Sequence, residues 1–186
     1  MKLIANQSGF TLAELLVVLI IISVLSSIAI VRFVSIKDEA ELARVESTAG
    51  AFKAAVKSVQ ITFNIQSLST RIQNLPNFGS GNVDTNNIGY PIGIDKGNGN
   101  ENIGRGNAGC AGIWQGILET SDDVGTGANN DYQSYRHTGN RVCSYVYRSG
   151  GDTAGRNSAE FVIQYDSRDG KVYVCGSKSK LAACPF

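Results

Sequence analysis

A run of apolar residues from Phe10 to Val31 constrains this chain more than any other feature of its sequence. The run holds 22 residues, and Glu14 is its only charged residue. At a helical rise of about 1.5 Å per residue it reaches about 33 Å, enough to cross a hydrocarbon core of about 30 Å. The helical pattern continues past Ala29, where a cleaved secretory signal would end. We therefore predict a retained transmembrane helix over residues 10–31, rather than a cleaved signal or a buried core helix.

Glu14 is an unusual residue at this position. A carboxylate at the centre of a bilayer costs about 3 kcal/mol, so it needs a stabilising partner. In one interpretation, Glu14 lies near the interface, where it snorkels or caps the start of the helix. In the other, it pairs with a cation inside the membrane. The residue spacing favours neither interpretation.

The residues from Gly9 to Glu14, followed by the aliphatic run, resemble the processing site of type IV prepilins and of the pseudopilins of type II secretion. The resemblance covers about the first 60 residues, and the short leader, residues 1–9, is similar to the type IVa class. It implies that a prepilin peptidase cuts after Gly9 and that the new amino terminus, Phe10, is methylated. It also implies that Glu14 neutralises the N-terminal ammonium of a neighbouring subunit, because two charges that are each costly in lipid become tolerable as a pair.

The same resemblance implies the partners and the location of the chain. Copies of the chain would form a helical filament with the help of an inner-membrane assembly machinery. Before assembly, the precursor would contact membrane lipid, with its head in the periplasm. The filament would then be an extracellular pilus or a periplasmic pseudopilus.

An amphipathic helix is predicted over residues 32–66. Apolar residues recur there at alternating steps of three and four, which is the spacing of one helix face. The stripe consists of Leu42, Val45, Ala49, Phe52, Val56, Val59 and Phe63, and the opposite face carries Glu41, Arg44, Glu46, Lys53 and Lys57. A coiled coil would give a similar stripe, but three heptads with small and aromatic residues favour packing against the chain's own sheet.

Residues 67–140 are predicted to form a Gly- and Asn-rich loop region, with little regular structure between Leu75 and Gly109. The segment Gly104–Gly109 matches the dinucleotide motif GxGxxG, but we expect neither a strand before it nor a helix after it, and so reject cofactor binding. Calcium is the one cofactor that we consider, because the region holds two groups of hard oxygen ligands. Their spacing fits no EF-hand, which favours solvated loops; they are Asp95, Asn98, Asn100, Glu101, Asp122, Asp123, Asn129, Asn130 and Asp131.

Residues 141–186 are predicted to form an antiparallel sheet. Three segments, 142–148, 161–165 and 171–175, are rich in β-branched and aromatic residues, and the turn 166–170 joins the last two as a hairpin. In the first segment, Cys143, Tyr145 and Tyr147 would share one face. The predicted fold is α+β, a long N-terminal helix packed across an antiparallel β-meander, as in pilins.

The four cysteines are predicted to form two disulfides. The chain has no CxxC pair, which argues against zinc or redox chemistry, and an even number of cysteines after a membrane span favours disulfides in an oxidising compartment. Four cysteines allow three connectivities. We predict Cys110 with Cys143 and Cys175 with Cys184, the second pair closing a small C-terminal loop like the one that pilins often have.

Catalysis finds little support in the sequence. The one histidine, His137, stands in a polar stretch, where we expect an exposed loop side chain, and no hydrolase or P-loop motif occurs. The aromatic residues Trp114, Tyr132, Tyr135, Tyr145 and Tyr147 are expected in the core rather than on a carbohydrate or DNA surface. With 17 Lys and Arg against 16 Asp and Glu, the net charge of +1 gives no reason to expect nucleic acid.

The sequence thus predicts a structural protein rather than an enzyme. The first hypothesis is a type IV pilus subunit that serves adhesion or surface attachment. The alternatives are a pseudopilin of a type II secretion system and a minor pilin for adhesion or DNA uptake.

Overall fold

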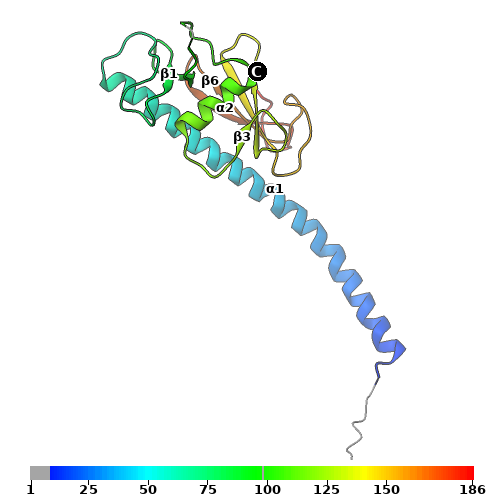
Figure 1. The fold of residues 1–186 in the computed structure, drawn as a ribbon. Helices are drawn as coiled ribbons and strands as arrows, with labels where there is room; N and C mark the ends of the chain where they lie inside the picture. Colours follow the sequence, from blue (N-terminus) through cyan, green and yellow to red (C-terminus); the bar gives the residue numbers. More distant parts are fainter. Residues whose placement is uncertain (1–8, 98) are drawn as a thin grey trace, which may run out of the picture. The chain divides into compact units, whose positions relative to one another are not determined.

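The computed structural model describes residues 9–97 and 99–186, so residues 1–8 of the predicted leader and the calcium candidate Asn98 lie outside it. Its helices and strands follow one another along the chain (Figure 1). They are α1 (Leu12–Ile65), β1 (Val83–Thr85), β2 (Pro91–Ile94), α2 (Gly106–Ile117), β3 (Val124–Gly125), β4 (Tyr132–Arg136), β5 (Val142–Tyr147), β6 (Val162–Asp166) and β7 (Lys171–Cys175).

Helix α1 contributes to two compact units, of which the first ends at Glu41 and the second covers Leu42–Phe186. In the first unit, the large apolar side chains of α1 are exposed. Two hydroxyls bond back to carbonyls of the preceding turn: Ser23 Oγ donates to Leu19 O and Ser27 Oγ to Val24 O, each at 2.7 Å. These bonds satisfy the hydroxyl donors within the helix, so neither serine needs a partner from elsewhere.

In the second unit, a five-stranded sheet has the order β3-β4-β5-β6-β7. Strands β4 to β7 pair antiparallel, which confirms the predicted meander, while β3 pairs parallel with β4. The predicted hairpin between β6 and β7 is present, and its last residue, Gly170, has a φ of +71°. A Cβ at Gly170 would lie 2.1 Å from Cε1 of Tyr90, so both the backbone and the packing require glycine there.

The predicted stripe of α1 packs in two clusters. Val45, Ala49, Phe52 and Val56 lie in the main core with residues of this sheet, whereas Val59 and Phe63 pack with Leu75 and with Val83 of β1. Six of its seven residues are buried, and Leu42 is half-buried at the edge. Phe52 lies at the centre, with ring centroids 5.3 Å from Trp114, 5.4 Å from Tyr145 and 5.7 Å from Tyr165. Such ring pairs contribute about 0.5–1.5 kcal/mol each beyond area burial. The core position expected for the aromatic residues is confirmed, except that Tyr135 is only half-buried and faces the other side of the sheet.

The prediction that residues 67–140 form a Gly- and Asn-rich loop region with little regular structure is wrong in part. This region contains a two-stranded antiparallel sheet, β1 with β2, and the helix α2, as well as β3 and β4. Helix α2 buries Ile113 and Trp114 in the same core as the α1 stripe. Its glycines allow a close approach that a propensity argument does not anticipate, since a Cβ at Gly109 would lie 2.1 Å from the carbonyl oxygen of Gly104.

The opposite face of the sheet carries a smaller cluster of buried side chains. Val146 and Val162 pack there with Ala159 and Cys175. The alternation predicted for β5 is therefore confirmed, because Cys143, Tyr145 and Tyr147 lie in the main core and Val146 lies in this second cluster.

Candidate functional site

Gly9 and Phe10 directly precede the first helix. A Cβ at Gly9 would have no neighbour within 4 Å, and Phe10 is 82% exposed. Neither residue belongs to a helix or strand. The peptide bond between them is thus not covered by the described residues, while residues 1–8 of the predicted leader lie outside that part of the chain.

Thr11 and Glu14 form a capping box at the start of α1. Glu14 Oε2 accepts hydrogen bonds from the backbone N and from Oγ1 of Thr11, both at 2.9 Å, and the backbone N of Glu14 donates to Thr11 Oγ1 at 3.3 Å. The arrangement satisfies amide donors that the first helical turn leaves unpaired. In the single chain Glu14 therefore caps the helix, which is one of the two roles expected for it.

The other carboxylate oxygen of Glu14 has no hydrogen-bond partner among the described residues. A carboxylate offers about four lone-pair sites, and the capping box occupies two of them. The second expected role, pairing with a cation from another molecule, is therefore sterically compatible with the first.

The helix after Glu14 is apolar enough to cross a membrane by length and composition. Its most apolar 18-residue window has a mean hydropathy of 2.8, and none of that window is buried inside the structure. Exposed leucine, isoleucine and valine side chains follow one another from Leu15 to Ile36. A surface of this kind is stable only in lipid or against other apolar surfaces.

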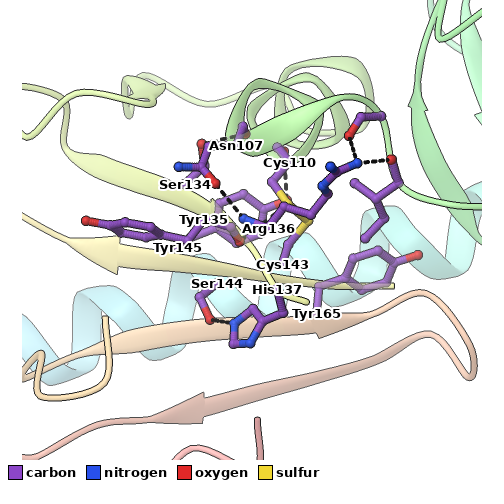
Figure 2. Close-up of a disulfide and its surroundings, with 12 residues drawn as sticks. Asn107, Cys110, Ser134, Tyr135, Arg136, His137, Cys143, Ser144, Tyr145 and Tyr165 are labelled. Atoms are coloured by element: carbon purple, nitrogen blue, oxygen red, sulfur yellow. Dashed lines mark hydrogen bonds between the residues drawn. A yellow bond between two sulfur atoms is a disulfide. The ribbon is translucent and has the colours of Figure 1, made fainter. Parts of the chain in front are cut away.

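Two disulfides connect elements of the second unit, and both predicted pairs are present. Cys110 of α2 is joined to Cys143 of β5, with a Cα separation of 5.6 Å (Figure 2). Cys175, the last residue of β7, is joined to Cys184 with a Cα separation of 4.9 Å. The first bridge fixes α2 on the sheet and the second closes the C-terminal loop.

Hydrogen bonds reinforce the attachment of α2 around the first disulfide (Figure 2). Arg136 Nη1 donates to the carbonyls of Ile103 and Gly104, both at 2.9 Å, and Asn107 Oδ1 accepts from the backbone N of Arg136 at 2.9 Å. The expectation that no helix follows the GxGxxG segment is wrong, because α2 begins at Gly106. Two of its glycines, Gly104 and Gly109, serve the close contact described above.

The oxygen ligands considered for calcium mostly have partners within the chain. Lys96 Nζ donates to the carbonyl of Asn100 at 2.6 Å, and Asp122 accepts from Arg44 at 2.5 Å. Asp123 Oδ2 accepts from Asn130 at 2.5 Å, and Asp131 accepts from the hydroxyl of Ser149. In residues 9–97 and 99–186, no group of three or more His, Cys, Asp or Glu side chains is placed to hold a metal ion.

The expectation that His137 is an exposed loop residue is wrong. It is 8% exposed, and its Nε2 lies 2.7 Å from Ser144 Oγ (Figure 2). Ser144 Oγ also accepts from Gln164 Nε2 at 3.0 Å, and that amide donates to the carbonyl of Phe186 at 3.0 Å. Burial and the nearby charge of Arg156 lower the pKa of His137 to about 4, so the imidazole is neutral at pH 7.

Comparison with known proteins finds similarity in the N-terminal segment. Residues 4–30 match the prokaryotic N-terminal methylation motif. A stretch of 50 residues is 49% identical to the type IV narrow pilus major component PilA5 of Thermus thermophilus, which is 27% of this chain and 43% of that protein. The match thus spans less than half of the relative, and no solved structure matches the chain. These findings confirm the predicted resemblance to type IV pilins in the N-terminal segment.

Proposed function

We propose that this chain, which carries the methylation motif of type IV prepilins, is a structural subunit of a type IV pilus. The observation that carries the proposal is the join between an exposed Gly9–Phe10 bond and an apolar helix that begins with the capping box of Thr11 and Glu14. A prepilin peptidase would cut after Gly9 and methylate Phe10. The similarity to a pilus component of Thermus thermophilus supports a pilus over other filaments.

Polymerisation would bury the apolar part of α1 against other copies of the same helix. In the membrane, the charge of Glu14 costs free energy unless it is paired. The carboxylate oxygen outside the capping box can accept a hydrogen bond from the N-terminal ammonium of a neighbouring Phe10. Assembly would then remove two charges from lipid in one contact. A head-to-tail contact that does not close on itself yields a filament rather than a ring.

The proposed location follows from the same features. The precursor would span the inner membrane through α1, with residues 42–186 in the periplasm, and the assembled filament would be extracellular. The disulfides Cys110–Cys143 and Cys175–Cys184 are consistent with folding in an oxidising compartment. In an extracellular filament, the exposed heads would serve adhesion or surface attachment.

We propose a structural rather than an enzymatic role for the head. His137 is the only histidine, and its Nε2 lies 2.7 Å from the hydroxyl of Ser144, a serine that is 1% exposed. The proposed function requires no metal or other cofactor.

Mass spectrometry of filaments sheared from the cell surface tests the proposal. We expect a chain that begins at N-methylated Phe10. Detection of the mature chain only in the inner membrane would instead favour a pseudopilin of a type II secretion system, and detection of Met1 would contradict processing altogether. Gly9→Ser should leave the precursor in the membrane, whereas the matched change Gly50→Ser, at a glycine of α1 that also has open space around it, should not.

A further inference from the structure

The C-terminal part of the chain is basic, although the whole chain is nearly neutral. Residues 136–186 hold eight Lys and Arg against four Asp and Glu, so the remaining residues carry a net negative charge. Charge of one sign gathered on one part of a head is a feature of surfaces that bind ions of the opposite sign.

A pocket of about 340 Å³ lies where two turns of the sheet meet the end of the chain. The turn between β4 and β5 contributes residues 137–139 and 141, and β5 contributes its first residue, Val142. The turn after β6 contributes Arg168, and the loop between β5 and β6 contributes Arg156. Phe186 completes the wall, with its ring 5.1 Å from the Arg168 guanidinium. Three guanidinium groups line this pocket and no Asp or Glu side chain does, since its lining residues are His137, Thr138, Gly139, Arg141, Val142, Arg156, Arg168 and Phe186.

The three arginines differ in how far they are already engaged. Arg168 is paired with Asp166 at 2.6 Å, and Arg141 with Glu101 at 3.2 Å. Arg156 has one polar partner in the described part of the chain, the side-chain oxygen of neighbouring Asn157, which accepts from Nε at 3.2 Å. A guanidinium has five N–H donors, so four donors of Arg156 remain for a ligand. The charge of Arg156 also contributes to the low pKa of His137, consistent with a positive potential in this pocket.

A second pocket of about 440 Å³ shares Arg156 and Phe186 with the first. Its other walls offer neutral polar groups, among them Asn157 and Ser177. The two pockets are therefore adjacent, and together we call them the depression: Arg141 and Arg168 line the first pocket only, Arg156 lines both, and the other polar groups of the second pocket are neutral. A buried and unpartnered acceptor, Gln164 Oε1, lies in the polar network under this region.

The geometry points to a binding site for an acidic oligosaccharide, with a sugar carboxylate at Arg156 and a neighbouring hydroxyl-bearing unit in the second pocket. A neutral polyol matches the amide and hydroxyl groups of the second pocket, and a carboxylate matches the planar donor fork of an arginine. Single-stranded nucleic acid fits less well, because it needs successive aromatic platforms and Phe186 is the one exposed ring in these two pockets. The proposed ligand would be bound by the head during adhesion. This biological role rests on the proposed function, whereas the binding itself rests on the pocket geometry.

Calorimetric titration of the full chain in nonionic detergent with trigalacturonic acid tests the site. We expect saturable binding that weakens as salt is added, and no binding of the methyl-esterified trisaccharide, which lacks the charge. Arg156→Gln should weaken binding about tenfold or more, because a charge-assisted hydrogen bond is lost. Lys53→Gln, the same charge change on the exposed face of α1, should bind like the wild type.

Three results would overturn the inference. They are no binding of the trisaccharide by the wild type, equal binding of the methyl ester, and unchanged affinity in Arg156→Gln. Tighter binding of an oligothymidylate of equal charge would assign the depression to nucleic acid instead. Trp114 fluorescence during unfolding checks that Arg156→Gln is folded, and the methyl-ester comparison needs no variant. Since the titration uses unassembled chain, its failure is distinguishable from a failure of the sheared-filament experiment.

Discussion

The neutral, buried state of His137 predicts that the head loses stability as the pH falls from 8 to 5. The pKa of His137 is lowered to about 4 in the folded chain, mainly by burial, whereas a histidine in an unfolded chain has a pKa of about 6.5. Between these two values the unfolded state binds a proton that the folded state does not. Stability therefore rises with pH in this window, and it is lost as the pH falls below 6.5.

The magnitude follows from the two pKa values. Their difference corresponds to a ceiling of about 3.4 kcal/mol, which would be reached only below pH 4. At pH 5 the loss relative to pH 8 is about 2 kcal/mol, because the unfolded histidine is then almost fully protonated and the folded one is mostly neutral. His137 is the only histidine of the chain, so no second imidazole contributes.

Urea unfolding of the full chain in nonionic detergent measures this loss through the fluorescence of Trp114, the only tryptophan, which is 1% exposed. We expect the free energy of unfolding to fall by about 2 kcal/mol between pH 8 and pH 5 in the wild type and to change far less in His137→Gln. A flat wild-type profile, or an equal loss in His137→Gln, would refute the argument that burial keeps the imidazole neutral.

Four further changes have expected outcomes. Glu14→Gln keeps the acceptor for the capping box but removes the charge, so chains should be processed while the yield of sheared filaments falls; a wild-type yield would contradict charge pairing. Gly109→Ala should lower the free energy of unfolding by about 1–3 kcal/mol in urea, and a loss under about 0.5 kcal/mol would contradict the close contact between Gly109 and Gly104. Phe52→Ala should lower it by about 3–5 kcal/mol, and a loss under about 0.5 kcal/mol would contradict the central position of Phe52. Removal of the second disulfide by Cys175→Ser with Cys184→Ser should cost about 2–3 kcal/mol, and an unchanged urea midpoint would contradict this.

The elements that the sequence predicts well are those whose pattern repeats. The α1 stripe alternates steps of three and four, and each buried residue follows from that period. Strands β5, β6 and β7 are identified by alternation, and a turn rich in Asp and Gly marks the hairpin between β6 and β7. The N-terminal methylation motif is found from its pattern, because a charged residue in an apolar run is rare enough to be informative.

Helix α2 is not predicted from the sequence, and the reason is physical. Its sequence contains four glycines in 12 residues, and each costs about 1 kcal/mol in a helix relative to alanine. The cost is offset by tertiary contact with β2, since a Cβ at Gly112 would lie 3.1 Å from Ile94 Cγ1 and a Cβ at Gly116 would lie 2.4 Å from Ile94 Cγ2. The information lies in the packing partners, which a local pattern does not contain.

His137 is missed for a similar reason. Its polar neighbours in the chain indicate a loop, but its environment is made by Ser144 and Gln164, which reach it through strand pairing. The pocket lined by Arg141, Arg156 and Arg168 likewise takes these residues from three separate loops between strands. Burial of a single polar residue depends on distant segments, so spacing alone does not reveal it.

The contact of Phe52 with Tyr145 and Tyr165 has a consequence for the order of events during biosynthesis. The ribosome completes α1 long before it makes the strands that cover the apolar stripe. Contacts between residues so far apart in the chain form slowly, because a long loop must close first. During that interval the stripe is open to aggregation or to binding by a chaperone, so a chain that stops before β6 should be a preferred substrate for proteolysis.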